Sequence, residues 1–187
     1  MMITKRITTK KIITLAMLIA LSAVLALVRI PIPPITTLAF DSLPGFVAAA
    51  LFGPLVGGIV GALGHLFTAL YSGFPFGAVA HLIVMATMFI TMFVFGLIYR
   101  KGFKIPAAIT ALIVNGPISL IPFIFLFGWG MVVSMILPLS IAAAVNIVIA
   151  MIIIPILEKA LKLDTRNKTL FDEKESVLEE KPIVSEE

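Results

Sequence analysis

Polar side chains that could bind a ligand are few in this chain, and most lie inside long apolar segments. His81, Asn115 and Asn146 offer hydrogen-bonding groups in such surroundings. Polar groups in hydrocarbon are costly unless they are satisfied, so they tend to face the interior of a helix bundle. There they either join helices or contact a ligand. With the aromatic and acidic residues beside them, the candidate ligand-binding residues are Asn146, Asn115, His81, Trp129, Phe74, Phe76 and Asp41.

Each candidate also has a purely structural interpretation. For Asn146, deep in the last apolar segment, ligand contact and an interhelical hydrogen bond are equally open. Asn115 precedes a Gly-Pro pair, where its amide could satisfy freed backbone groups. Trp129 suits an interfacial aromatic belt or stacking on a ligand ring. Asp41 is expected to cap a helix first and to bind a ligand second, and His65 could be structural or ligand-facing.

Catalytic and metal-binding chemistry is not expected. The chain has no cysteine, which excludes disulfides, a thiol nucleophile and thiolate metal ligands. Two histidines are too few for a closed zinc site without carboxylates. No G-x-S-x-G, H-E-x-x-H, P-loop or G-x-G-x-x-G motif is present, so a membrane enzyme is disfavoured. Asp41 is the only acid in residues 1–157, so the chain lacks the groups that couple transport to ions. We predict no catalytic residue, no metal and no cofactor.

Composition places most of the chain in lipid. Of 187 residues, 60% are hydrophobic and 13% charged, and the mean hydropathy is +1.17. A soluble domain carries about 25% charged residues. Residues 1–163 hold ten Lys or Arg against two acids, whereas residues 164–187 hold four against eight. The basic residues flank apolar segments, so they indicate membrane topology and not a nucleic-acid surface.

The apolar segments predict an all-α membrane protein of six helices. A spanning helix needs about 20 apolar residues, and Gly53-Pro54 splits one long apolar stretch in two. The proline-rich segment 29–37 is expected to be a loop. The predicted helices cover residues 12–28, 43–53, 55–71, 77–98, 106–126 and 131–157.

The basic residues predict the orientation of these helices. With six spans and a cytoplasmic N-terminus, Arg29 is the only Lys or Arg left outside. We therefore expect both termini in the cytoplasm of a bacterial cell, with the helices in its plasma membrane. Residues 1–163 form one transmembrane substrate-binding domain in this scheme. Residues 164–187 form an acidic cytoplasmic tail that we expect to be disordered.

Small residues recur at helical spacing on two of the predicted helices. Gly53, Gly57 and Gly61 allow another helix backbone to approach closely. A second stripe, on the first helix, consists of Ala16, Ala20 and Ala23. Internal packing is the default interpretation of both stripes, but a smooth helix face also suits docking against another membrane protein.

Several motifs resemble the substrate-specific S components of energy-coupling factor (ECF) transporters, bacterial vitamin importers. They are the basic N-terminus before Ala16-x-x-x-Ala20, the proline-bearing loop, Asp41-Ser42-Leu43-Pro44-Gly45 and Phe52-Gly53-Pro54-Leu55-Val56-Gly57. The spacing of the last two is typical of the riboflavin-transporter-like group. The resemblance covers about residues 10–160. It implies that the chain binds a vitamin or precursor near the outer face, beneath the loop after the first helix. Ala16 and Ala20 would then meet a coupling membrane protein that carries two ATPases, whose ATP hydrolysis topples the S component and releases its cargo inside.

The expected substrate is α-ribazole, a cobalamin precursor. Asp41-Ser42-Leu43-Pro44-Gly45, Gly61-Ala62-Leu63-Gly64-His65 and Gly73-Phe74-Pro75-Phe76-Gly77 with His81 resemble S components assigned to it. Riboflavin or another flat heterocyclic vitamin would need nearly the same stacking and hydrogen-bonding groups. A self-sufficient small permease is the alternative outside this family.

Overall fold

Glycine and proline determine where most helices of this chain begin and end. The computed structural model describes residues 9–32, 36–162 and 164–166. Helix α3 begins at a proline, after Gly53 with its φ of 111°, and ends before Gly73 with its φ of 72°, both conformations that favour glycine. The elements are α1 (Thr9–Leu25), β1 (Arg29–Ile32), β2 (Thr36–Ala39), α2 (Leu43–Leu51), α3 (Pro54–Ser72), α4 (Gly77–Arg100), α5 (Lys104–Asn115), a 3-10 turn η1 (Ile118–Leu120) and α6 (Phe123–Ala160).

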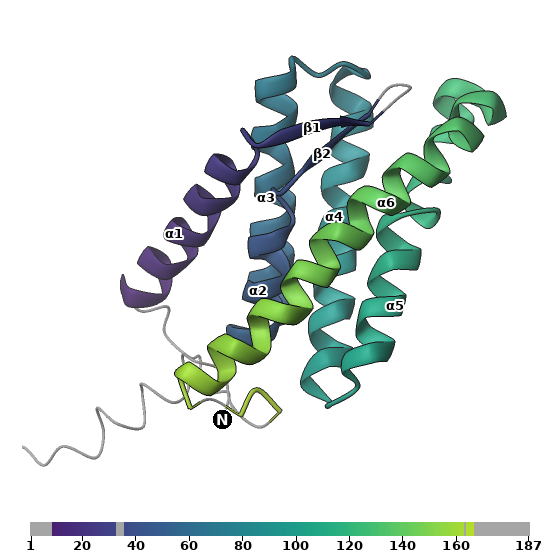
Figure 1. Ribbon diagram of the computed structural model, residues 1–187. Helices are drawn as coiled ribbons and strands as arrows, with labels where there is room; N and C mark the ends of the chain where they lie inside the picture. Colours follow the sequence, from purple (N-terminus) through teal and green to yellow (C-terminus); the bar gives the residue numbers. More distant parts are fainter. Residues whose placement is uncertain (1–8, 33–35, 163, 167–187) are drawn as a thin grey trace, which may run out of the picture.

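The helices form one bundle with the short hairpin at one end (Figure 1). Helix α3 packs against α1, α2 and α4, and α5 packs between α4 and α6. In Figure 1, α6 runs obliquely over α2 and α5, both of which it contacts. Buried side chains of α2, α4, α5 and α6 make the main core, with Phe46 packed edge-on against Phe95 at 5.0 Å.

Glycines on α3 and α4 allow the helices to approach closely. A β-carbon added at Gly57 would lie 2.3 Å from Ala49 Cβ, and one at Gly61 would lie 2.7 Å from Met92 Cγ. Gly96 of α4 likewise lies against the backbone of Ala49 and Pro54. The predicted internal role of the glycine stripe is therefore what the structure shows.

The segment 29–37 was predicted to be a loop, but the structure forms a short β-hairpin there within an otherwise helical fold. Strands β1 and β2 pair antiparallel, with Arg29 opposite Ala39 and Ile32 opposite Thr36. Proline fixes φ near the extended range and is tolerated in an edge pair. Proline content therefore excluded a helix here but did not exclude a strand. The hairpin contacts α6 through β2.

The fifth and sixth predicted helices have different boundaries in the structure. The predicted helix at 106–126 ends at Asn115, because Gly116-Pro117 interrupts it before η1. Residues from Phe123 onward continue into α6, and Gly128, with φ 78° and ψ 170°, breaks the helical path inside it. Pro138 and Pro155 lie within α6. The first helix also starts and ends three residues earlier than predicted.

Three of the described helices, α3, α4 and α6, are long and apolar enough to cross a membrane. Two shorter apolar helical segments lie at Ile12–Leu25 and Lys104–Leu120. Most of the predicted acidic tail, residues 167–187, lies outside the described residues, as do Lys5 and Arg6.

The end of the bundle opposite the hairpin is held by charged groups. Lys104 Nζ at the start of α5 donates to Glu158 Oε2 near the end of α6 at 2.9 Å. The other oxygen of Glu158 accepts a hydrogen bond from Thr165 at 2.6 Å. Arg100 donates to the carbonyl oxygen of Ala50 on α2 at 3.1 Å. Basic side chains therefore gather at this end.

Gly57→Ala is expected to destabilise the bundle. The added methyl would overlap Ala49, including its backbone, so α2 and α3 would have to move apart, at a cost of about 1–3 kcal/mol. The thermal unfolding midpoint of the purified protein in detergent measures the effect. Gly130→Ala is the matched control, because a β-carbon there meets nothing within 4 Å. An unchanged midpoint for Gly57→Ala would contradict the close packing of α2 on α3.

Candidate functional site

A cavity of about 400 Å³ lies at the hairpin end of the bundle. Its polar side chains come mainly from β1, the segment Phe40–Ser42 and α3, and its apolar ones from α4, η1 and α6. The polar lining residues are Arg29, Asp41, Ser42, His65, Thr68, Tyr71, Ser72, His81, Asn115, Ser119 and Asn146. A cavity of this size with a few convergent polar groups is typical of small-molecule sites.

Asp41 is buried at the base of the polar side. Its Oδ2 accepts a hydrogen bond from Thr68 Oγ1 at 2.6 Å and lies 3.5 Å from His65 Nδ1. Gly64 permits this arrangement, since a β-carbon there would lie 2.8 Å from the Asp41 carbonyl oxygen. Asp41 does not cap α2 as expected. Ser42 occupies the N-cap position without a side-chain capping bond, and the carboxylate of Asp41 turns to α3 instead.

The surroundings of Asp41 favour its charged form. Burial by itself raises the pKa of this carboxyl, but the hydrogen bond from His65 lowers it. The bonds from Thr68 and the Ser42 backbone lower it further, so the pKa lies below its ordinary value. The cavity therefore contains a carboxylate that is already satisfied by protein donors.

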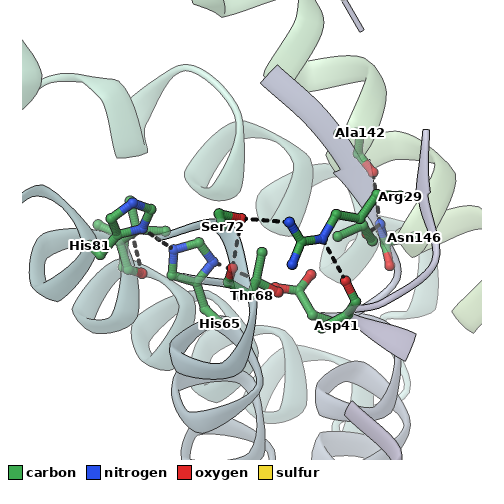
Figure 2. Close-up of polar contacts among 12 residues, drawn as sticks. Arg29, Asp41, His65, Thr68, Ser72, His81, Ala142 and Asn146 are labelled. Atoms are coloured by element: carbon green, nitrogen blue, oxygen red, sulfur yellow. Dashed lines mark hydrogen bonds and ion pairs between the residues drawn. The ribbon is translucent and has the colours of Figure 1, made fainter. Parts of the chain in front are cut away.

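Arg29 joins the hairpin to the helices beneath it. Its Nε donates to the Ala26 carbonyl at 3.0 Å, and one terminal nitrogen donates to Ser72 Oγ at 2.9 Å. Ser72 Oγ in turn donates to the Thr68 carbonyl at 2.7 Å. Figure 2 shows the guanidinium between Ser72 and the Asp41 side of the cluster.

Asn146 ties the hairpin to α6 from the other side. Its Nδ2 donates to the Ala39 carbonyl at 2.9 Å and to the Ala142 carbonyl at 3.0 Å. These bonds use both amide hydrogens, which fixes the orientation of the side chain. Its Oδ1 is buried and has no hydrogen-bond partner among the described residues.

The structure brings five of the seven candidate binding residues to this cavity: Asn146, Asn115, His81, Phe76 and Asp41. Phe74 does not line the cavity, but its ring packs edge-on against His81 at 5.5 Å. Trp129 follows the break at Gly128, is 66% exposed and lies outside the cavity lining. Trp129 is therefore not part of this cavity, and its stacking on a ligand ring stays a prediction.

Thr68 and Ser72 on α3 line the cavity but were not predicted from the sequence, and the role of His65 beside them had been left open. His65, Thr68 and Ser72 follow one another at helical spacing, and all three line the cavity. That spacing was the available signal, although it does not show which neighbour the polar face meets. Arg29 was noted only as a charge outside the membrane. In the described part of the chain, no cluster of three or more His, Asp or Glu side chains could hold a metal ion.

The alanine stripe on α1 faces outward. Ala16 and Ala20 are exposed, whereas Ala23 is half-buried against the bundle. Met17, Leu21 and Val24 on the same helix are also exposed, at 67%, 48% and 60%. The exposed side of α1 is thus apolar, with its smallest side chains at Ala16 and Ala20.

Comparison with known proteins gives three concordant matches. A family model described as "ECF transporter, substrate-specific component" matches residues 10–158. The riboflavin transporter RibU of Staphylococcus aureus (strain TCH60) is 35% identical over 109 residues, which are 56% of this chain and 56% of that protein. The match therefore spans a little over half the length of RibU.

A solved structure shares the fold. It is described as "Structure and mechanism of the S component of a bacterial ECF transporter" and superposes with a TM-score of 0.60 at 28% identity. The superposition covers 82% of this chain and 95% of the solved chain.

Arg29→Met is expected to loosen the hairpin. The substitution removes donors to Ser72 and Ala26 while keeping an unbranched side chain, and hydrogen bonds from charged groups contribute about 1.5–3 kcal/mol each. Hydrogen exchange of the β1 and β2 amides should become at least about tenfold faster. Lys101→Met, an exposed change at the other end of the bundle, is the control. Equal exchange in both variants would show that Arg29 does not hold the hairpin.

Proposed function

This chain belongs to the substrate-specific components of ECF transporters, and we propose that it captures riboflavin or a closely similar flat vitamin in the cavity beneath the hairpin. The observation that carries the proposal is the cavity itself, with buried hydrogen-bonding atoms that the protein leaves unpaired. Oδ1 of Asn146 and Nε2 of His81 are both buried without a partner among the described residues, and both residues line the cavity. A buried unpaired polar atom costs about 1–3 kcal/mol unless a ligand or water satisfies it.

The two sides of the cavity suit a ligand of this class. Val84, Met88, Leu139 and their neighbours offer apolar surface for a flat ring, and the side formed by β1 and α3 offers hydrogen bonds for a hydroxylated chain. The relative RibU is named a riboflavin transporter. The α-ribazole expected from the sequence has no such support from the reported relatives, so riboflavin takes its place as the leading ligand.

The charge distribution supports an outward-facing cavity. Arg100, Lys101 and Lys104 lie at the α4–α5 turn, at the opposite end of α4 from His81 and the cavity. Because basic residues favour the cytoplasmic side, the cavity end faces outward in a bacterial plasma membrane. Both termini are then cytoplasmic, and six helical segments cross or enter the bilayer.

Delivery requires partners in this proposal. The described helices contain no P-loop, and their one acid, Glu158 near the end of α6, is paired with Lys104. Asp41 precedes α2 and is held by Thr68. In this proposal the energy therefore comes from a coupling membrane protein with two ATPases. The exposed small residues Ala16 and Ala20 on α1 provide the docking face. Docking there topples the S component and releases the vitamin inside.

Asn146→Leu is expected to weaken riboflavin binding roughly tenfold to a hundredfold, because it removes the unpaired cavity acceptor, worth about 1–3 kcal/mol. Calorimetry on the detergent-purified chain measures the dissociation constants, with riboflavin, α-ribazole, cobalamin and pantothenate as ligands. Ser134→Ala, an exposed change on α6 outside the cavity, is the control.

Submicromolar binding of riboflavin supports the proposal. Tight binding of α-ribazole alone would correct the substrate within the same family. Failure of every vitamin to bind the properly folded protein would contradict the capture function and favour a self-sufficient permease, which would move solute in liposomes without partners. Native affinity in an Asn146→Leu variant with an unchanged unfolding midpoint would remove Asn146 from the site.

The double substitution Ala16→Trp and Ala20→Trp is expected to abolish riboflavin uptake, because in this proposal the exposed face of α1 contacts the coupling protein. The dissociation constant for riboflavin should stay within about twofold of the native value, because neither alanine lines the cavity. Riboflavin uptake by auxotrophic bacteria that produce the chain with an ECF coupling module measures transport. Met17→Trp with Leu21→Trp, exposed at the same spacing on the neighbouring face, is the matched control. Undiminished uptake in the alanine variant would place the docking face elsewhere, and lost binding would mean that the stripe packs internally.

A further inference from the structure

A chain of polar contacts runs from Asp41 through two histidines and ends at the cavity (Figure 2). His65 Nδ1 lies 3.5 Å from Asp41 Oδ2, and His65 Nε2 lies 3.2 Å from His81 Nδ1. The two imidazoles come from α3 and α4, and their rings lie nearly parallel, with 5.4 Å between centroids. The remaining ring nitrogen, Nε2 of His81, has no partner among the described residues.

The order of these contacts fixes where the protons lie. An ionised Asp41 can only accept, so His65 must carry its hydrogen on Nδ1 to donate to it. A neutral His65 then has a lone pair on Nε2, and His81 must place its hydrogen on Nδ1 to donate to that lone pair. Neutral His81 consequently has a lone pair on Nε2. The cavity therefore meets a hydrogen-bond acceptor at this position.

The His81 ring is also held in place by its packing. Phe74 lies edge-on to it at 5.5 Å, and the ring of Phe76, the N-cap residue of α4, lies 6.4 Å away. His81 is 8% exposed. Its Nε2 is thus a buried atom of a cavity-lining residue, and no described residue uses it.

We propose that the Asp41–His65–His81 chain is a specificity determinant, which presents Nε2 of His81 as an acceptor to an N–H or O–H donor of the ligand. His81 would contact the ligand, and Asp41 and His65 would act as positioning residues through it. This inference rests on the proposed function, since it concerns the ligand of the same cavity. Riboflavin carries such donors in its imide N–H and its hydroxyl groups.

One proton taken up by the histidine pair reverses this preference. A proton that binds His81 Nε2 makes the ring an imidazolium, and its Nδ1 hydrogen can then pass to His65 Nε2. In either position of the charge, Nε2 of His81 carries a hydrogen and has become a donor. Histidine is the side chain that ordinarily changes charge between about pH 5 and 8. The ionisable described residues that line the cavity are Arg29, Asp41, His65, Tyr71 and His81.

Nitrogen-15 NMR of the full chain with labelled histidine tests the proton positions without any ligand. The chain has only two histidines, so the spectrum contains few ring signals. At about pH 8, both rings should be protonated at Nδ1 and unprotonated at Nε2. In His65→Gln, His81 should show a mixture of both forms, because its Nδ1 no longer has a fixed acceptor. A His81 ring protonated at Nε2 in the native protein at this pH would overturn the proposal.

Calorimetry with riboflavin tests the consequence for binding. Between about pH 8 and pH 5.5, the dissociation constant of the native protein should rise about tenfold or more, because the donor of the ligand then meets a donor. His81→Gln should bind more weakly at pH 8 and lose this pH dependence. His65→Gln should weaken binding severalfold at pH 8, and Ser134→Ala should retain the native pH profile.

The outcomes separate this inference from the proposed function. Riboflavin binding that is equally tight at both pH values in the native protein would overturn the inference and leave the function standing. A native pH dependence that persists unchanged in His81→Gln would also overturn it. Absence of riboflavin binding at every pH would contradict the proposed ligand, and the NMR spectrum would then still decide the proton positions.

Discussion

Hydrocarbon offers no hydrogen bonds, and this constraint governs where the polar side chains of the protein lie. Outside the cavity, a hydroxyl such as that of Thr91 satisfies itself on its own helix, by donating to the Thr87 carbonyl at 2.7 Å. Most other buried polar side chains meet at the hairpin end, where Asp41, Thr68 and Asn146 find partners on other elements. The apolar bundle thus contains a polar chamber at its hairpin end, and the unpaired atoms of its lining residues define what a ligand must supply.

The hydrogen bonds around this chamber also hold the β-hairpin in place over it. Arg29 ties β1 to Ser72 on α3, and Asn146 ties β2 to α6 through the Ala39 carbonyl. These bonds are few, and both acceptors are neutral. The other end of the bundle is instead joined by the Lys104–Glu158 ion pair. The hairpin is therefore held to the helices by a small number of side-chain bonds, which suits a site that must admit a ligand from one side.

Local chemistry explains which features could be predicted from the sequence. The break at Gly53-Pro54 and the turn before Gly77 depend on residues adjacent in the chain, and both appear where expected. The hairpin was missed because proline excludes a helix without excluding a strand. The pairing of His65 with His81 depends on the alignment of two helices, which no single-helix pattern contains. Trp129 points outward because Gly128 redirects the chain just before it, a φ of 78° that glycine permits but does not require.

The outward position of Trp129 has a consequence for optical measurements. It is the only tryptophan of the chain and lies outside the cavity lining. Its emission therefore reports the detergent or lipid beside the break in α6, and a bound vitamin can alter it only through energy transfer or a movement of that helix. A chromophoric ligand would supply a second signal from within the chamber. The fold thus provides two separate reporters, one for the surface of α6 and one for the occupied site.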